Sequence, residues 1–377
     1  MTCGINIGVV GLGFGQDFLP IYLDHPDVAD VAVVELDADH RELVASAHGI
    51  EARYGAIEEL LADDHWDAVH ILAPVRFHAE YSIATLDAGK HCACAVPMAT
   101  TLEDISAIVE AQRRSGCAYM MMETSAYTRE YLTAADLYER GELGELTLYR
   151  GFHIQNLDGF AWYWQGYPPM HYLTHALSPI LAITGSVVTS VRAMGSGRLQ
   201  PHQISGGFDN PFSSEIGLFA LDRSDVVADI TMSFFRVARS YREGFDLYGD
   251  AMGLEWPEEL DGPWRSFRLR PADGSKGRTA DAKPVPTSVF TERLPEVIRR
   301  YTDHYPFQPA DGGPEYRRLA EHGGSHPHLA HEFVSAIKDA RASRVDASVA
   351  AAWTAPGIIA HQSALTGGQP MDVPHYG

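Results

Sequence analysis

Short, mostly apolar runs alternate with helix-like segments over the first third of the chain. The runs lie at residues 5–10, 31–36, 68–72, 91–95 and 119–122, and each is too short for a helix of ordinary length. Segments with apolar groups at helical spacing lie between them, at residues 17–23, 41–48, 57–62, 83–88 and 101–115. This alternation predicts an α/β domain over residues 1–125, built on a doubly wound parallel sheet.

The pattern changes after residue 125. An amphipathic helix is predicted at 129–140, and a second helix at 171–183. The remaining apolar runs predict strands at 146–155, 187–194, 214–221, 226–235 and 242–254, and runs of strands with few helices favour a mostly antiparallel sheet. Residues 257–315 are rich in Pro, Gly and charge and are predicted to be long loops, and helices are predicted at 328–342 and 347–365. Residues 126–377 thus form a second domain, with the option that its C-terminal helices pack back on the first.

Glycines follow the first predicted strand at positions 11, 13 and 15. A strand, a glycine turn and a helix form the start of a dinucleotide-binding unit, in which helix N-terminal amides hold the pyrophosphate. The third glycine of the usual G-x-G-x-x-G pattern falls at Gln16, so Gly15 stands one place early. The alternative is an ordinary tight turn between a strand and a helix.

Glu35 lies about twenty residues beyond the glycines, near the end of the second predicted strand. A carboxylate there accepts hydrogen bonds from the adenosine ribose, and because no arginine follows closely the sequence favours NAD over NADP. The alternative is a solvated carboxylate. Ligands bind outside the carboxyl ends of parallel strands. The predicted cofactor-binding residues are therefore Gly11, Gly13, Phe14, Gly15, Glu35, Ala73, Pro74, His78, Ala95, Pro97 and Glu123.

Composition narrows the class of partner. The chain has 377 residues, 45% of them hydrophobic, and a formal net charge of −21, which disfavours nucleic acid and anionic membranes. Its four cysteines lack metal-site spacing and are expected to be buried free thiols in a reducing compartment. A strand that begins at residue 5 leaves no room for a signal peptide, and no apolar stretch reaches membrane-spanning length. We therefore expect a cytoplasmic protein.

Two histidine-containing stretches are candidates for proton transfer. His171 and His175 are four residues apart, so one helix would place both on the same face. They could act as general acid or base, be hydrogen-bonded core residues or bind a metal, although no third ligand is evident. His322 and His326 flank a glycine pair, which indicates either a functional loop or a merely solvated one, too flexible for a core.

Glu123 stands where a parallel strand would deliver a side chain to the cofactor crevice. It could act as a base if burial raised its pKa, and a capping or ribose-binding role is the alternative. Tyr127 and His153 are further candidates of the same kind. The aromatic residues between 160 and 167 could stack on a sugar or simply pack the loop.

Several motifs resemble the glucose-fructose oxidoreductase, inositol dehydrogenase and MocA (Gfo/Idh/MocA) family. They are the glycine turn, Gly89-Lys90-His91 before Pro97, residues 140–146 (RGELGEL) and His175. The resemblance implies an N-terminal Rossmann domain and a C-terminal α/β domain whose open sheet supports a homodimer or homotetramer. Ordinary dehydrogenases of this family carry a catalytic lysine where this chain has Val96, and an aspartate where it has His171. Only His175 matches their catalytic set.

The NAD-dependent glycosidases on this fold resemble the chain more narrowly. Members of the α-N-acetylgalactosaminidase type also have a valine before that proline. They have stretches similar to Met121-Met122-Glu123, Tyr172-Leu173-Thr174-His175 and His322-Gly323-Gly324. NAD-using sulfoquinovosidases are a further resemblance, in which Arg129 or His326 would bind a sulfonate.

This resemblance implies redox-neutral hydrolysis of a sugar glycoside. NAD oxidises the sugar at C3, the aglycone leaves by β-elimination, water adds, and C3 is reduced again. The implied catalytic residues are His175 for the hydroxyl proton, Glu123 or His171 for the C2 proton, His322 or His326 for the leaving group, and Tyr127 as an additional candidate. An NAD-dependent sugar dehydrogenase and a non-catalytic NAD sensor are the two alternatives.

Overall fold

The computed structural model describes residues 4–204, 206–259, 262–272, 274, 277–307, 316–318 and 320–376. By its internal contacts the chain divides into two units, which are described one at a time. Unit 1 contains the described residues of 1–128, 289–351 and 376–377, and unit 2 contains those of 129–288 and 352–375. None of the helices in the described residues is long and apolar enough to cross a membrane.

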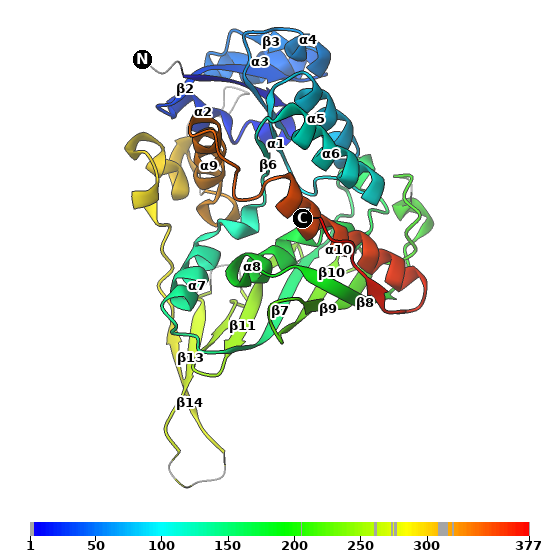
Figure 1. The fold of residues 1–377 in the computed structure, drawn as a ribbon, viewed down its shortest axis with the longest axis vertical. Coiled ribbons are helices and arrows are strands. Elements are labelled where there is room, and N and C mark those ends of the chain that lie inside the picture. The colour runs from blue at the N-terminus through cyan, green and yellow to red at the C-terminus, as the bar shows by residue number, and fades with distance from the viewer. Residues whose placement is uncertain are drawn as a thin grey trace. The chain divides into compact units, whose positions relative to one another are not determined.

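A six-stranded sheet forms the centre of unit 1 (Figure 1). All its neighbouring strands run parallel, in the order β3-β2-β1-β4-β5-β6. The strands are β1 (Ile5–Val10), β2 (Val28–Val34), β3 (Arg53–Tyr54), β4 (Ala68–Ile71), β5 (His91–Cys94) and β6 (Tyr119–Met121). The chain order reverses beside β1, which is the switch point where such sheets bind ligands. The predicted doubly wound parallel sheet is confirmed.

Helices connect and cover these strands. The longer ones are α2 (Leu19–Asp24), α3 (Ala38–His48), α4 (Ile57–Leu61), α5 (His78–Asp87), α6 (Leu102–Ser115) and α9 (His326–Lys338). Thr101 caps α6 by accepting a bond from the Asp104 amide, and Gly116 ends that helix in the left-handed conformation. The bounds of α6 agree with the helix predicted at 101–115.

The helix predicted at 17–23 is α2, which begins two residues later, and a single helical turn, α1 (Leu12–Gly15), precedes it. Pro20 stands in the first turn of α2, and it has no N–H to donate to a carbonyl four residues earlier. The helix is therefore interrupted between α1 and α2, because proline is compatible with a helix start and not with a helix interior.

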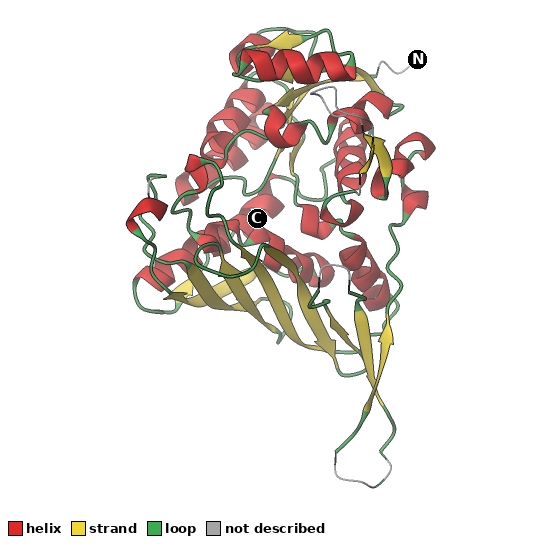
Figure 2. Cartoon of the chain, turned by 180° about the vertical axis from the view of Figure 1, so that it is seen from behind, coloured by secondary structure: helices red, strands yellow, loops and turns green. Residues whose placement is uncertain are grey.

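Unit 2 contains a nine-stranded sheet in the order β14-β13-β12-β11-β7-β10-β9-β8-β17, which Figure 2 shows as one twisted layer of strands. Only the β7–β10 pair is parallel. The strands are β7 (Leu146–Gln155), β8 (Val188–Ser196), β9 (Ser214–Leu221), β10 (Val227–Ser233), β11 (Tyr241–Gly249), β12 (Gly253–Glu255), β13 (Arg265–Leu269), β14 (Ala280–Pro284) and β17 (Met371–Asp372). The mostly antiparallel second sheet is confirmed.

Two strand predictions are wrong in detail. Residues 242–254 form two strands, because the chain turns back where the Gly249 amide donates to the Met252 carbonyl. The predicted loop region 257–315 contains the β13–β14 hairpin, which extends from the edge of the sheet (Figure 1), and also β15 (Tyr305–Phe307). The two hairpin strands carry mostly exposed side chains and few large apolar ones, so no strong apolar alternation marks them.

The predicted helix at 171–183 is also divided. A 3₁₀ turn, η4 (Pro169–Tyr172), precedes α8 (Thr174–Thr184), which packs on the sheet. The other helices with residues in unit 2 are α7 (Arg129–Glu139) and α10 (Ala347–Leu365), whose first residues belong to unit 1. Cys92, Cys94 and Cys117 are buried free thiols as predicted, whereas Cys3 lies outside the described residues.

Candidate functional site

The three glycines of the first turn have separate roles. Gly11 has a positive φ of 88°, and an added Cβ would lie 2.8 Å from the Ala73 backbone nitrogen, so no other residue fits there. At Gly13 an added Cβ would meet nothing within 4 Å, which leaves open space over the backbone. At Gly15 a Cβ would lie 2.9 Å from Cγ1 of Val9 in β1. The glycine that stands one place early therefore allows close packing of α1 on the strand.

Glu35 joins this turn to the end of β2. Its carboxylate accepts the Leu12 amide at 3.0 Å and the Asp37 amide at 3.2 Å. The Arg41 guanidinium in α3 donates to the Glu35 carbonyl at 2.6 Å, so an arginine does lie near Glu35 in space, although the sequence spacing did not indicate it. The open space at Gly13 and the carboxylate beside the Leu12 amide fit an adenosine diphosphate moiety. The ribose contact itself remains a prediction.

His78 connects the loops that follow β4 and β5. It is 1% exposed, and its Nδ1 lies 2.7 Å from the Pro97 carbonyl while its Nε2 lies 2.9 Å from the Ala73 carbonyl. Both carbonyls can only accept, so both ring nitrogens must donate, which requires the charged imidazolium. Burial opposes this charge, but the adjacent Cys94 and the two carbonyls outweigh it and raise the pKa of His78 to about 8. The predicted residues at these two strand ends thus share one edge of the sheet.

Glu123 and Tyr127 are buried within unit 1. Glu123 is 0% exposed, and its Oε1 accepts the Ser125 amide at 2.9 Å, so the capping alternative is the one observed. The Arg344 guanidinium lies 5.5 Å from the centre of the Tyr127 ring. A base role for Glu123 remains a prediction, and its burial makes access to a substrate difficult.

His322 and His326 lie beside the glycine turn. His326 Nε2 is 3.2 Å from His322 Nδ1. Both rings pack edge-on against the Phe14 ring, with a centroid distance of 5.4 Å for His326 and 5.7 Å for His322. His326 also stacks on Phe18 at 4.5 Å. The structure therefore brings two of the predicted catalytic residues next to a predicted cofactor-binding residue. His322 is half-buried and His326 is buried.

The expectation that this histidine stretch is too flexible for a core is wrong. Ser325, His326 and His328 are all buried, and His328 Nε2 lies 2.7 Å from the Val289 carbonyl. Burial lowers the pKa of His328 to about 4. Gly324, with a φ of +79°, explains the difference, because an added Cβ would lie 2.4 Å from the Thr302 carbonyl. The glycine pair allows close packing here instead of giving mobility.

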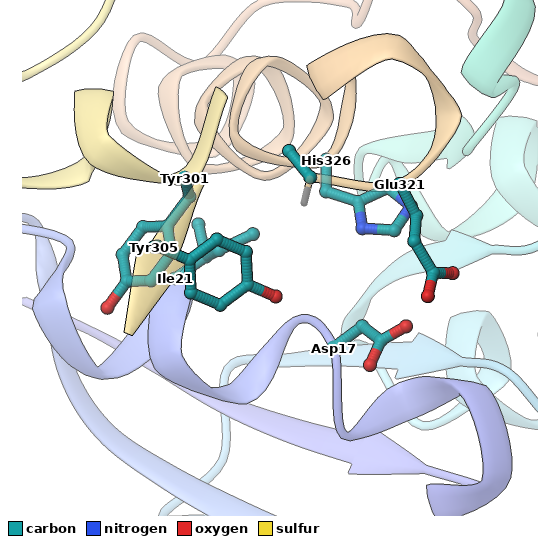
Figure 3. A pocket seen from close by; sticks show the side chains of 7 residues that line it. Asp17, Ile21, Tyr301, Tyr305, Glu321 and His326 are labelled. Carbon is teal, nitrogen blue, oxygen red and sulfur yellow. The ribbon is translucent and has the colours of Figure 1, made fainter. Parts of the chain in front are cut away.

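A small pocket in unit 1 has His326 on its wall. Figure 3 shows the carboxylates of Asp17 and Glu321 on the same side of this pocket as the imidazole, with the Tyr305 hydroxyl group directed between them. A sulfonate bound by His326 would lie beside two carboxylates, and like charges at short range repel. The prediction that His326 binds a sulfonate therefore finds no support in its surroundings.

His175 lies at the start of α8 in a cluster of polar and aromatic side chains of unit 2. Its Nδ1 is 4.0 Å from Oε1 of Glu243, and Nδ1 of His153 is 3.6 Å from the other carboxylate oxygen. The Tyr241 hydroxyl group donates to Glu243 at 2.6 Å, and the Tyr172 ring lies 4.8 Å from that of His175. Glu243 is thus a shared carboxylate between two buried histidines.

Glu243 is a residue that the sequence reasoning missed. It lies in β11, where the register pairs it directly with His153 of β7. The side chains of directly paired residues lie on the same face of a sheet, so the strand register is the signal that would have identified it. The weaker candidate His153 belongs to the same cluster.

His171 lies apart from this cluster, contrary to the expectation of one shared face. The chain leaves η4 and enters α8 between the two histidines, and the ring of His171 faces His361 at 5.1 Å. Burial and the charge on His361 lower the pKa of His171 to about 3, so it is neutral near pH 7. The described residues hold no group of three or more His, Cys, Asp or Glu side chains arranged for a metal ion.

Unit 1 is a Rossmann sheet with a glycine turn at its switch point, and unit 2 contains a histidine that faces a carboxylate. Together these features are typical of an NAD-binding oxidoreductase fold. Residues 5–123 match the family described as "Oxidoreductase family, NAD-binding Rossmann fold". These residues belong to the Gfo/Idh/MocA family, which confirms the predicted family and its cofactor, NAD.

Curated relatives carry two kinds of name. An uncharacterized oxidoreductase of Rhizobium meliloti is 27% identical over 157 residues, 41% of this chain and 47% of that protein. A glycosyl hydrolase family 109 protein of Shewanella sp. (strain ANA-3) is 30% identical over 336 residues, 85% of this chain and 65% of that protein. The chain thus spans less than two thirds of the length of each of these two relatives.

The fold also matches a solved structure. A levoglucosan dehydrogenase in complex with NADH and levoglucosan superposes with a TM-score of 0.78 at 18% identity, covering 99% of this chain and 100% of that one. At this identity the likeness establishes the fold, and the two kinds of relative leave the reaction type to be argued from the site.

Proposed function

We propose that this protein is an NAD-dependent glycoside hydrolase that works without net oxidation. The observation that carries the proposal is Val96, which is 6% exposed and stands where ordinary dehydrogenases of the family have their catalytic lysine. An isopropyl group cannot transfer a proton, so proton transfer must come from other side chains. The similarity to glycosyl hydrolase family 109 proteins supports the same assignment.

Unit 1 provides the cofactor site. The open backbone at Gly13 would receive the pyrophosphate, and Glu35 and the loops held by His78 would border the rest of the cofactor. NAD⁺, when bound, would supply the hydride chemistry without a net change in its own oxidation state. The net reaction is then hydrolysis.

His175 is the residue that we propose to accept the proton of the sugar hydroxyl group. Its Nδ1 faces the Glu243 carboxylate, which favours the tautomer with the proton on Nδ1. In that tautomer Nε2 carries the lone pair that would accept the proton. The carboxylate then stabilises the imidazolium that forms, as in other histidine–carboxylate pairs.

The later steps require a second base and an acid. Oxidation at C3 acidifies the C2 hydrogen, because removal of that proton gives an enolate. We assign its removal to His171, which is half-buried and neutral, in preference to the fully buried Glu123. Protonation of the leaving aglycone is assigned to His322, which is more exposed than His326. This elimination route needs no pair of carboxylates at glycosidase spacing.

The proposed substrate is a sugar glycoside. A sulfoquinovoside remains one candidate, but its sulfonate would have to be bound by a residue other than His326, because Asp17 and Glu321 line the pocket of that histidine. Arg129, at the start of α7, is the other predicted sulfonate ligand. A comparison of neutral and sulfonated aryl glycosides would identify which substrate class the protein accepts.

The test compares two products in one reaction. The purified protein, supplied with NAD⁺, is given a panel of aryl glycosides, and aglycone release and NADH absorbance are recorded together. The proposal predicts many equivalents of aglycone for each equivalent of NADH. NADH formation that keeps pace with substrate consumption, with no aglycone released, would instead identify an NAD-dependent sugar dehydrogenase. NAD binding without turnover of any glycoside would indicate the sensor.

A further inference from the structure

A buried carboxylate–histidine pair lies behind His171 in unit 2. Glu215 of β9 is 0% exposed, and its Oε1 lies 2.7 Å from Nδ1 of His361 in α10. Its Oε2 accepts the Met170 amide at 2.9 Å. Both carboxylate oxygens are therefore engaged, one by a histidine and the other by the backbone of η4, the element that carries His171.

The pair is brought close to His171 by the packing of α10. An added Cβ at Gly357 would lie 2.2 Å from the Met170 carbonyl, so only glycine allows α10 to approach η4 this closely. The His361 and His171 rings then meet edge to face, with centroids 5.1 Å apart at 82°. Nδ1 of His171 is buried and has no hydrogen-bond partner among the described residues.

Burial and the charge on His361 both disfavour protonation of His171. His361 faces the His171 ring from α10, and its own Nδ1 lies 2.7 Å from Oε1 of Glu215. Tyr167, from the segment before η4, lies with its ring 6.0 Å from His171, and burial raises the pKa of its hydroxyl group well above the usual value, so this neighbour is uncharged. An imidazole in such surroundings can accept a proton but does not hold one at rest.

We infer that Glu215 and His361 position His171 and hold it as a neutral imidazole, which makes His171 the proton acceptor for the C2 hydrogen of the substrate. The assignment rests on the proposed function, and it adds two positioning residues from β9 and α10. Glu215 bonds both His361 and the backbone of η4, so a single side chain holds the two elements that place the base.

The first test uses the protein without substrate. The protein is labelled at histidine, the His171 signals are assigned with H171Q, and the ring chemical shifts are followed by NMR from pH 4.5 to pH 8. The inference predicts that His171 stays neutral over the whole range in the wild type. A wild-type His171 that titrates near pH 6.5, the ordinary histidine value, would overturn it.

E215Q is the decisive variant. The glutamine oxygen can still accept the Met170 amide, but His361 loses its counter-ion and with it the charge that faces His171. The midpoint of His171 should then rise from its wild-type value of about 3, far enough for the start of its titration to be seen at the acid end of the observed range. An unchanged His171 in E215Q would refute the role of the pair. If E215Q does not fold, the double variant E215Q/H361Q removes both charges together, and the midpoint of His171 should rise in it as well. The matched control is H202Q, because His202 is exposed.

Kinetics connect the pair to the base. In E215Q the acid limb of the pH profile of kcat for aryl glycoside hydrolysis should move to higher pH, while KM changes little, because a base with a higher pKa is lost earlier on acidification. A uniform loss of activity at every pH would indicate a merely structural role. Absence of glycoside turnover in the wild type would refute the proposed function, yet leave the NMR result on His171 intact, so the two failures are distinguishable.

Discussion

A buried, charged His78 predicts a specific dependence of stability on pH. The group is 1% exposed, and its folded pKa of about 8 lies above the value of about 6.5 of an unperturbed histidine. A folded pKa above the unfolded one contributes stability that is fully present below pH 6.5 and is lost as pH rises through 8. The difference of roughly 1.5 units corresponds to about 2 kcal/mol at 1.36 kcal/mol per unit.

The perturbation is H78Q. A neutral glutamine cannot reproduce an imidazolium that donates to the Pro97 and Ala73 carbonyls on opposite sides. Urea unfolding of wild type and variant should therefore show a large difference in the free energy of unfolding at pH 6. At pH 9.5 that difference should be smaller by about 2 kcal/mol.

The control for H78Q is H202Q, because His202 is exposed and its replacement should alter neither value. A difference between wild type and H78Q that stays constant from pH 6 to pH 9.5 would refute the charged state. A difference that grows with pH would show that the sign of the pKa shift is wrong.

Three further predictions concern the cofactor turn, the proposed base and the open sheet. G13A should leave the free energy of unfolding within about 0.5 kcal/mol but weaken NAD binding roughly tenfold or more, measured by calorimetry, whereas G15A should cost about 1–3 kcal/mol through the clash with β1. E243Q should lower kcat by on the order of 10²-fold with little change in KM, because it removes the charge that faces His175. A rise in KM as large as the fall in kcat would argue against that role. Leu218 is 51% exposed on β9, so if the sheet face supports the predicted homodimer or homotetramer, L218D should yield a monomer by light scattering, whereas an unchanged mass would exclude this face.

The sequence predicted the parallel sheet of unit 1 well because its signals are local. Thr101 and Gly116 mark the two ends of one helix, and the apolar runs are strands buried on both faces. The interrupted helix after the glycine turn could also have been anticipated from Pro20. The β13–β14 hairpin could not, because strands exposed on both faces carry no apolar periodicity.

The candidate site was predictable only where one residue or one motif carries it. The glycines, His175 and His322 fall in recognisable motifs. Glu243 and the Glu215–His361 pair depend on strand register and on the approach of a distant helix, and neither leaves a local signal in the sequence. The burial of Glu123 likewise results from tertiary packing, which residue spacing does not encode.

Isotope incorporation during turnover tests the central claim most directly. Hydrolysis of an aryl glycoside is run in D₂O with the wild-type protein and NAD⁺, and the released sugar is analysed by NMR at each carbon. Redox-neutral elimination predicts deuterium at C2 of the released sugar, because the C2 proton is removed and then replaced from solvent. A released sugar that retains only hydrogen at C2 would contradict the elimination step and with it the proposed mechanism.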